Sequence, residues 1–300
     1  MTNDSIRGTG MNHARGAKPA LLGIPFDGQS SYLRGAGEAP PKIREAIACD
    51  ASNQWTELGV DLGVPGGFED CGDLKILERA TTRDTVGENP HLWQNQPEVG
   101  HPFFEIERGI AGLIDSGKRP LSLGGDHSIT YPIVKAFAAR YPGLTIFHFD
   151  AHPDLYDEFE GNRLSHACPF ARIMEAGLAR KLVQIGIRAA TMHQREQAQR
   201  FGVEVIEMSG LPAYDKLKAE GPIYISFDID VLDPAFAPGV SHREPGGMTV
   251  REAVAHLHAI QGSIVGADLV EYNPVRDVNG LTATVAAKLV KEILGKMIVA

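Results

Sequence analysis

The stretch FHFDAHPDLYD, residues 147–157, begins like a buried β-strand and then carries ligand-type side chains at every second position. Asp150, His152 and Asp154 alternate along the chain, so on an extended backbone they face the same side. Burying one unpaired carboxylate costs several kcal/mol, and neighbouring carboxylates repel one another or bind protons. The stretch therefore predicts a strand whose carboxyl end holds a ligand that neutralises these groups.

Short apolar runs rich in β-branched residues alternate along the chain with longer segments of helical period. The runs predict strands at 20–26, 120–125, 144–150, 182–188, 203–208, 223–230 and 263–272. The longer segments predict helices near 39–48, 103–117, 130–141, 166–181, 250–262 and 282–297. Thr249 and Glu252 form a capping box at the start of the helix at 250. Apolar strands separated by helices indicate an α/β fold whose parallel sheet is covered on both faces.

The segments without a clear strand or helix pattern show how many domains to expect. Residues 51–100 are the least regular part and predict loops with, at most, a short edge element. Residues 1–17 are polar and lack the apolar core of about 7–15 residues that marks a signal peptide. We therefore expect a flexible leader at 1–17, a single domain at 18–300 and a cytoplasmic location.

The composition is that of a soluble globular protein, with 43% hydrophobic and 22% charged residues among 300. No apolar run approaches the roughly 20 residues of a membrane span. The net charge of −9 argues against a nucleic-acid binder and mildly favours a cationic partner. Cys49, Cys71 and Cys168 show no CxxC spacing, so neither a disulfide framework nor a thiolate zinc site is indicated.

Three predicted strands end in metal-ligand chemistry, and in open parallel sheets ligands bind outside the carboxyl ends of the strands. The strand ends read GGDHSIT, DAHPD and SFDIDVLDP. If these strands lie side by side, two histidines and four carboxylates converge: His127, Asp150, His152, Asp154, Asp228 and Asp230. Two divalent cations would match the four carboxylate charges, and oxygen-rich ligation with some imidazole favours Mn²⁺, with Zn, Co, Ni and Fe as the alternatives.

Some neighbouring residues have simpler interpretations. Asp233 precedes Pro234 and fits a turn former, and Asp126 fits a residue that orients its neighbours. His148 and His258 are typical of packed or surface histidines. The combination of DxHxD, DxD and GGDH, each ending an apolar strand, is much harder to explain by structure alone.

These motifs resemble the ureohydrolase family, which includes arginases, agmatinases, guanidinobutyrases and formiminoglutamases. The resemblance runs from GIPFD to AAKLV, and AHPDLYDEFEGNRLSHACPFARIMEAG, DPAFAPGVSHREPGGMT and ADLVEYNPVRD look most like plant-type arginases and their bacterial relatives. It implies a three-layer αβα fold with a mostly parallel sheet of about eight strands. It also implies two Mn²⁺ ions per subunit, hydrolysis of a guanidino group to urea and an amine, and a homotrimer or homohexamer.

The resemblance assigns roles residue by residue. One Mn²⁺ would be bound by His127, Asp150, Asp154 and Asp228, and the other by Asp150, His152, Asp228 and Asp230. Glu271 would face the substrate guanidinium, His166 would shuttle the proton to the leaving amine, and Asp154 would help to move the proton of the nucleophile. Asn162 and Thr249 are assigned to substrate binding, and Asp268 is assigned to support of the ligands.

The preferred guanidine depends on the loops at 155–166 and 188–197 and on the segment SSYLRGAG. Asn162 favours L-arginine as the substrate, whereas Arg34 stands in a segment that leans towards agmatinases. Arg243 gives slight support to a substrate that bears a carboxylate. L-Arginine is therefore the expected substrate, with agmatine and guanidino acids such as guanidinobutyrate as alternatives.

Two other classes of protein share parts of the pattern. A mononuclear zinc deacetylase also uses a DxH motif and later aspartates, but it needs only one metal. A non-catalytic relative would be expected to have lost ligands, and all six are present here. The complete set therefore favours a binuclear hydrolase.

Overall fold

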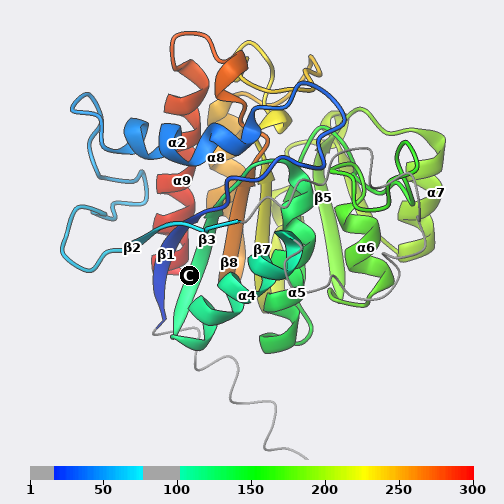
Figure 1. Ribbon diagram of the computed structural model, residues 1–300, viewed down its shortest axis with the longest axis horizontal. Helices are drawn as coiled ribbons and strands as arrows, with labels where there is room; N and C mark the ends of the chain where they lie inside the picture. Colours follow the sequence, from blue (N-terminus) through cyan, green and yellow to red (C-terminus); the bar gives the residue numbers. More distant parts are fainter. Residues whose placement is uncertain (1–16, 77–101) are drawn as a thin grey trace, which may run out of the picture.

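A sheet of eight strands forms the centre of the computed structural model, which describes residues 17–76 and 102–300 (Figure 1). Across the sheet lie β2 (Glu69–Asp73), β1 (Lys18–Gly23), β3 (Lys118–Leu123), β8 (Gln261–Val270), β7 (Lys218–Asp228), β4 (Thr145–Phe149), β5 (Lys181–Ile187) and β6 (Glu204–Glu207). Every paired strand runs parallel to its neighbour. The predicted sheet of about eight mostly parallel strands is confirmed.

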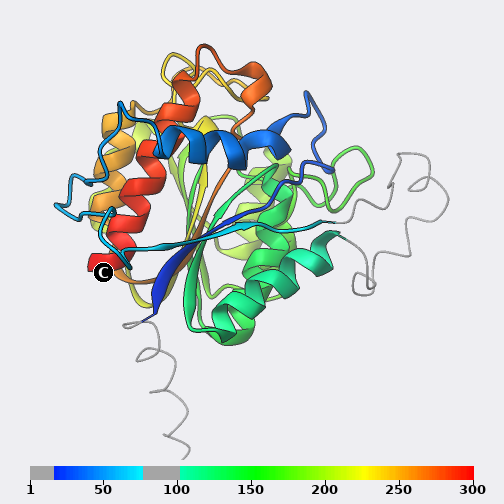
Figure 2. The ribbon, with the colours of Figure 1, turned by 60° about the vertical axis from the view of Figure 1, so that its left-hand side comes forward.

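Helices cover both faces of this sheet, as the view in Figure 2 shows. One face carries α2 (Ala39–Ile47), α8 (Val250–Ala259) and α9 (Leu281–Val299). The other carries α4 (Pro102–Asp115), α5 (Thr130–Arg140), α6 (Pro169–Glu175) and α7 (Met192–Phe201). Each face has its own apolar core, and all five residues of β4 between them are buried. The predicted three-layer αβα arrangement is therefore confirmed.

Two elements differ from the sequence-based expectation. The segment 188–197, predicted as a loop, enters α7 at Met192. This helix is strongly polar and buries only Gln194, Gln197 and Ala198, so its apolar period is too weak to reveal it. The predicted helix at 166–181 is shorter, because α6 begins at Pro169 and ends at Glu175. By contrast, β2 is the short edge element expected within 51–100.

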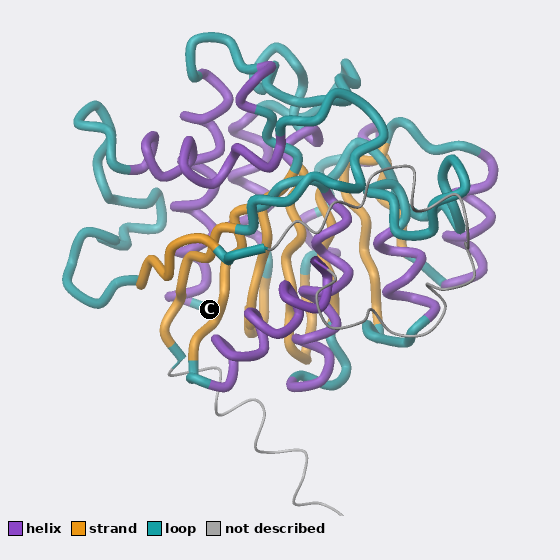
Figure 3. Tube along the Cα trace, in the orientation of Figure 1, coloured by secondary structure: helices purple, strands orange, loops and turns teal. Residues whose placement is uncertain are grey.

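The long loops gather where the carboxyl ends of the strands point (Figure 3). Within residues 17–76 and 102–300, no helix is long and apolar enough to cross a membrane. The predicted leader at 1–17 lies outside the described residues except for Ala17. The single domain at 18–300 stays a prediction.

Candidate functional site

The GGDH segment forms a tight turn that brings His127 to the carboxyl edge of the sheet. Gly125 lies so close to the preceding loop that a Cβ atom there would stand 1.7 Å from the carbonyl oxygen of Phe26. Asp126 accepts hydrogen bonds from the backbone N–H groups of Ser128 (3.1 Å) and Gln29 (2.9 Å). Burial raises the pKa of Asp126 to about 6. Asp126 therefore supports the turn, in agreement with its interpretation as an orienting residue.

Three carboxylates surround the Nδ1 atom of His127. It lies 3.1 Å from Asp150 Oδ2, 3.1 Å from Asp154 Oδ2 and 3.2 Å from Asp228 Oδ2. The imidazole is fully buried, and its Nδ1 atom makes no hydrogen bond of acceptable geometry to any of them. Burial lowers the pKa of His127, but the three carboxylates outweigh burial and raise it well above its ordinary value. A positive charge is therefore strongly favoured at this point, either a proton or a metal ion.

The hydrogen bond at Nε2 of His127 fixes the tautomer of this imidazole. Ser226 Oγ donates its single proton to Asp268 Oδ1 at 2.8 Å, so at 3.0 Å it can only accept from His127 Nε2. Thr130 Oγ1 (2.9 Å) and the Tyr224 hydroxyl (2.6 Å) donate to the other oxygen of Asp268. A neutral His127 therefore carries its proton on Nε2 and directs the Nδ1 lone pair at three carboxylates. A bound cation would relieve the repulsion between this lone pair and the carboxylate oxygens, so the residues present fit a metal ion.

His127 and its three carboxylates form a first ligand group, and a second ligand group around His152 lies beside it. His152 Nδ1 is 3.0 Å from Asp230 Oδ2 and 3.5 Å from Asp150 Oδ1. The two oxygens of Asp150 thus face the two groups separately, which suits a carboxylate that bridges two ions. Burial and repulsion from neighbouring carboxylates raise the pKa of Asp228 well above its ordinary value, and burial raises that of Asp230 to about 6. Positive charge at both groups would relieve this repulsion.

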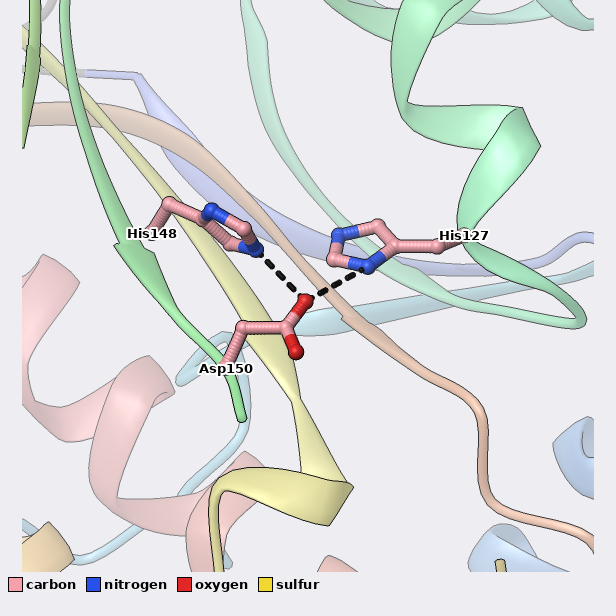
Figure 4. Close-up of side chains that lie close together, drawn as sticks. All are labelled: His127, His148 and Asp150. Atoms are coloured by element: carbon pink, nitrogen blue, oxygen red, sulfur yellow. Dashed lines mark hydrogen bonds and ion pairs between the residues drawn. The ribbon is translucent and has the colours of Figure 1, made fainter. Parts of the chain in front are cut away.

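Figure 4 shows a further histidine at the site, His148, whose Nε2 atom lies 2.7 Å from Asp150 Oδ2. The ring is fully buried and stacks on Phe170 with centroids 3.8 Å apart. The sequence suggested a packed residue here, and the structure adds a direct contact with a predicted ligand. The signal was present in the sequence, because His148 stands two residues before Asp150 on the same side of the strand.

Glu271 and His166 form a pair above the two groups. His166 Nδ1 lies 3.1 Å from Glu271 Oε1, and its Nε2 atom lies 2.9 Å from Ser31 Oγ. Burial lowers the pKa of His166, but the Glu271 carboxylate outweighs burial and raises it to about 9. Glu271 also accepts the His127 backbone N–H at 2.9 Å. Its φ of 63° lies in the left-handed region, a strained conformation that is common at functional sites.

These groups open into a cavity of about 170 Å³. Its lining comprises Ser31, His152, Asp154, Tyr156, Phe159, His166, Ala167, Ala189, Gln194, Asp228, Asp230, His242 and Glu271. His242 stacks on His166 with centroids 5.0 Å apart. Sequence reasoning did not single out His242, Ser31 or Gln194, because none belongs to a strand-end motif, although Ser31 and Gln194 lie in the segments 30–37 and 188–197 that it assigned to substrate selection.

Several predicted substrate-binding residues are engaged elsewhere. Asn162 donates to Gln29 Oε1 at 2.7 Å and accepts the backbone N–H of Leu164 at 2.9 Å. Thr249 caps α8 by bonding Glu252, and neither Asn162 nor Thr249 belongs to the described cavity lining. The guanidinium of Arg34 pairs with Asp27 at 2.8 Å. The roles of Asn162 and Thr249 in substrate binding therefore stay predictions.

Arg243 is likewise held away from the described cavity lining. Its Nε atom donates to the Pro238 carbonyl at 2.9 Å, and Nη2 donates to the Arg276 carbonyl at 3.3 Å. Its suggested role in selecting a carboxylate substrate gains no support from these contacts.

The chain is similar over almost its whole length to known proteins. A family model described as Arginase family matches residues 17–295. "Arginase 1, mitochondrial" of Arabidopsis thaliana is 48% identical over 290 residues, 94% of this chain and 81% of that protein. "Agmatinase" of Bacillus subtilis (strain 168) is 34% identical, over 93% of this chain and 91% of that protein. The solved structure "Arginase from Medicago truncatula" has a TM-score of 0.83 and 43% identity, covering 96% of this chain and 95% of that one.

Proposed function

Because the chain belongs to the arginase family, we propose that it is a binuclear metal-dependent ureohydrolase that cleaves L-arginine to L-ornithine and urea. The observation that carries this proposal is the buried, unpaired Nδ1 atom of His127 among three carboxylate oxygens at 3.1–3.2 Å. A protein without a cation there would have to tolerate concentrated buried negative charge. The family match favours this function over the mononuclear zinc deacetylase considered from the sequence.

The two groups of side chains support two cations. One would be held by His127, Asp150, Asp154 and Asp228, and the other by Asp150, His152, Asp228 and Asp230. Carboxylate oxygens with two imidazoles and no thiolate suit Mn²⁺. The three cysteines fit this choice, since Cys49 is exposed and the hydrogen bonds of Cys71 and Cys168 are made with residues outside these groups.

In the proposed reaction, the chain positions the substrate and supplies the proton. When bound, the cations would lower the pKa of a water molecule and so supply the nucleophile. The Glu271 carboxylate faces the cavity and would hold the guanidinium by charge and hydrogen bonding. The Glu271 carboxylate raises the His166 pKa to about 9, which favours the protonated imidazole at neutral pH. His166 would therefore donate a proton to the leaving amine as the carbon–nitrogen bond breaks.

The choice of L-arginine rests on similarity, since the plant arginases are 48% identical and the bacterial agmatinases 34%. Agmatine is the alternative, and guanidino acids follow. The acidic residues of the cavity lining are the proposed ligands Asp154, Asp228 and Asp230 and the proposed guanidinium partner Glu271, so the rest of the lining, which includes Ser31, Tyr156, Ala189 and Gln194, bears no further acid. Such a lining would accept the zwitterionic end of arginine more readily than it would retain the second cation of agmatine.

The remaining assignments are also proposals. We expect a single domain at 18–300 that assembles as a homotrimer or homohexamer, which sedimentation velocity would measure. The sequence predicts a cytoplasmic location, yet plant relatives carry "mitochondrial" in their names. Fractionation of the native cells would decide between a cytoplasmic and an organellar location.

The decisive experiment measures urea release by the Mn²⁺-loaded protein with L-arginine, agmatine and 4-guanidinobutyrate. We expect kcat/KM to be highest for L-arginine. A higher kcat/KM for agmatine would identify agmatine as the substrate in place of L-arginine, and the ureohydrolase proposal would stand. The absence of urea with all three substrates, despite two bound Mn²⁺ ions per subunit, would refute the proposal.

A further inference from the structure

A row of buried polar side chains crosses the sheet directly beneath the two ligand groups. In register on neighbouring strands stand Ser122 of β3, Asp268 of β8, Ser226 of β7, His148 of β4 and Gln184 of β5. All five are fully buried. Asp150 and Asp228 follow two residues after His148 and Ser226, so they lie on the same side of their strands. The row thus forms a polar layer between the predicted ligands and the apolar interior.

One half of the row is the Asp268–Ser226–His127 chain described above. The other half begins at Gln184, whose Nε2 atom lies 2.6 Å from the Pro153 carbonyl oxygen. Because a carbonyl oxygen only accepts hydrogen bonds, the nearer amide atom must be the nitrogen. The same nitrogen lies 3.0 Å from His148 Nδ1. Its second proton therefore points at that ring atom, and Nδ1 of His148 must accept.

The hydrogen bond from Gln184 to Nδ1 determines the protonation of the opposite ring nitrogen of His148, Nε2. With Nδ1 as acceptor, the neutral His148 carries its proton on Nε2 and donates it to Asp150 Oδ2 at 2.7 Å. The backbone N–H of His152 donates to the other oxygen of Asp150 at 2.6 Å. Each oxygen of Asp150 thus has one protein donor and keeps a lone pair for one ligand group.

The proximity of His148 to His127 and Asp150 also permits a different interpretation, in which His148 itself binds a metal. The hydrogen bonds oppose it, because both ring nitrogens are already in use. We infer that Gln184 and His148 form a hydrogen-bond relay that fixes Asp150 in its bridging orientation, so that His148 is a positioning residue and not a metal ligand. This inference rests on the proposed binuclear function.

The test compares two substitutions of His148. In His148→Gln, the side-chain amide can place a donor close to the position of the imidazole Nε2 atom. In His148→Leu, the side chain fills similar space and donates nothing. Mn²⁺ affinity is measured by calorimetric titration of the chelator-treated full-length protein, and electron paramagnetic resonance reports whether the two bound ions remain coupled.

We expect His148→Leu to weaken Mn²⁺ binding about 10–100-fold, as loss of a residue that orients a ligand does. His148→Gln should stay within a few-fold of the wild type and keep the coupled signal. Equal loss in both variants, with one ion missing, would identify His148 as a ligand and overturn the inference. Unchanged affinity in both variants would also overturn it.

A second measurement keeps the inference testable if His148→Leu does not fold. Nitrogen NMR of the metal-free wild type labelled at histidine should show His148 with Nδ1 unprotonated and Nε2 protonated. In Gln184→Met, which removes the amide donor and retains the length of the side chain, this tautomer preference should weaken. A wild type in which Nδ1 carries the proton would contradict the relay. If the wild type binds no Mn²⁺ at all, the proposed function fails while the tautomer result still decides on the relay.

Discussion

The pairing of His166 with Glu271 gives a prediction whose size follows from the structure. Replacing Glu271 by glutamine keeps the side-chain shape and removes the charge that holds the His166 pKa at about 9 against burial. In the metal-free protein we expect that pKa to fall to about 6.5 or below, since burial then dominates. A change of about 2.5 pKa units corresponds to about 3 kcal/mol of coupling between the two groups.

The pH dependence follows from the sign of this shift. The His166 pKa is raised on folding, so its contribution to stability is fully present below pH 6.5 and is lost as pH rises through about 9. The difference in unfolding free energy between the wild type and Glu271→Gln isolates His166, because both proteins share the other titrating groups, and it should change by up to about 3 kcal/mol across this range.

The assay combines NMR titration of histidine-labelled, metal-free protein with urea denaturation at several pH values and one protein concentration. Glu204→Gln serves as the matched control. Hydrogen bonding to Lys181 lowers the pKa of Glu204 below 4.5, so Glu204 does not titrate between pH 6.5 and 9. A His166 pKa that stays near 9 in Glu271→Gln would refute the reasoning.

Four further outcomes are expected. Ser226→Ala removes the acceptor that fixes the His127 tautomer, so calorimetry should show Mn²⁺ binding weakened about 10–100-fold. Gly125→Ala forces a Cβ atom against the Phe26 carbonyl, and thermal denaturation should show a loss of about 3 kcal/mol or more. His166→Ala should keep two Mn²⁺ per subunit while kcat falls about 10²–10⁴-fold, and loss of metal would contradict the shuttle role. Chelation should lower Tm, and added Mn²⁺ should restore it in a concentration-dependent way.

The gathering of acidic and histidine side chains at the strand ends was predictable because it follows from the apolar strand pattern and the parallel sheet. Asp150 directly follows β4 and Asp228 ends β7, and these two strands pair in register with Phe149 opposite Phe227. His152, Asp154 and Asp230 lie beyond the strand ends, with Asp154 at a φ of 48° and Asp230 in a 3-10 helix, so loop conformation and not strand alternation brings them to the site. The parallel sheet and the chemistry at its carboxyl edge could be derived without coordinates, whereas the backbone conformation after each strand could not.

Other parts of the site depend on strand order and loop packing, which the local sequence does not encode. His127 reaches the site across β8, which separates β3 from β7 in the sheet. The role of Asn162 in binding a substrate carboxylate stays a prediction, and the local sequence did not reveal the hydrogen bonds of its side chain with Gln29 and Leu164. His242 lies in a loop without a regular period, and only folding brings it against His166.

The polar row beneath the ligand groups places buried polar side chains in a sheet that is otherwise apolar inside. Ser122 Oγ and Gln184 Oε1 are buried without a hydrogen-bond partner, and each such atom costs about 1–3 kcal/mol. Apolar side chains at these positions would avoid that cost. The atoms of the row that do find partners fix one tautomer of His127 and one of His148. This cost in stability falls where the polar row determines the orientation of two histidines and of Asp150, as the proposed site for two ions requires.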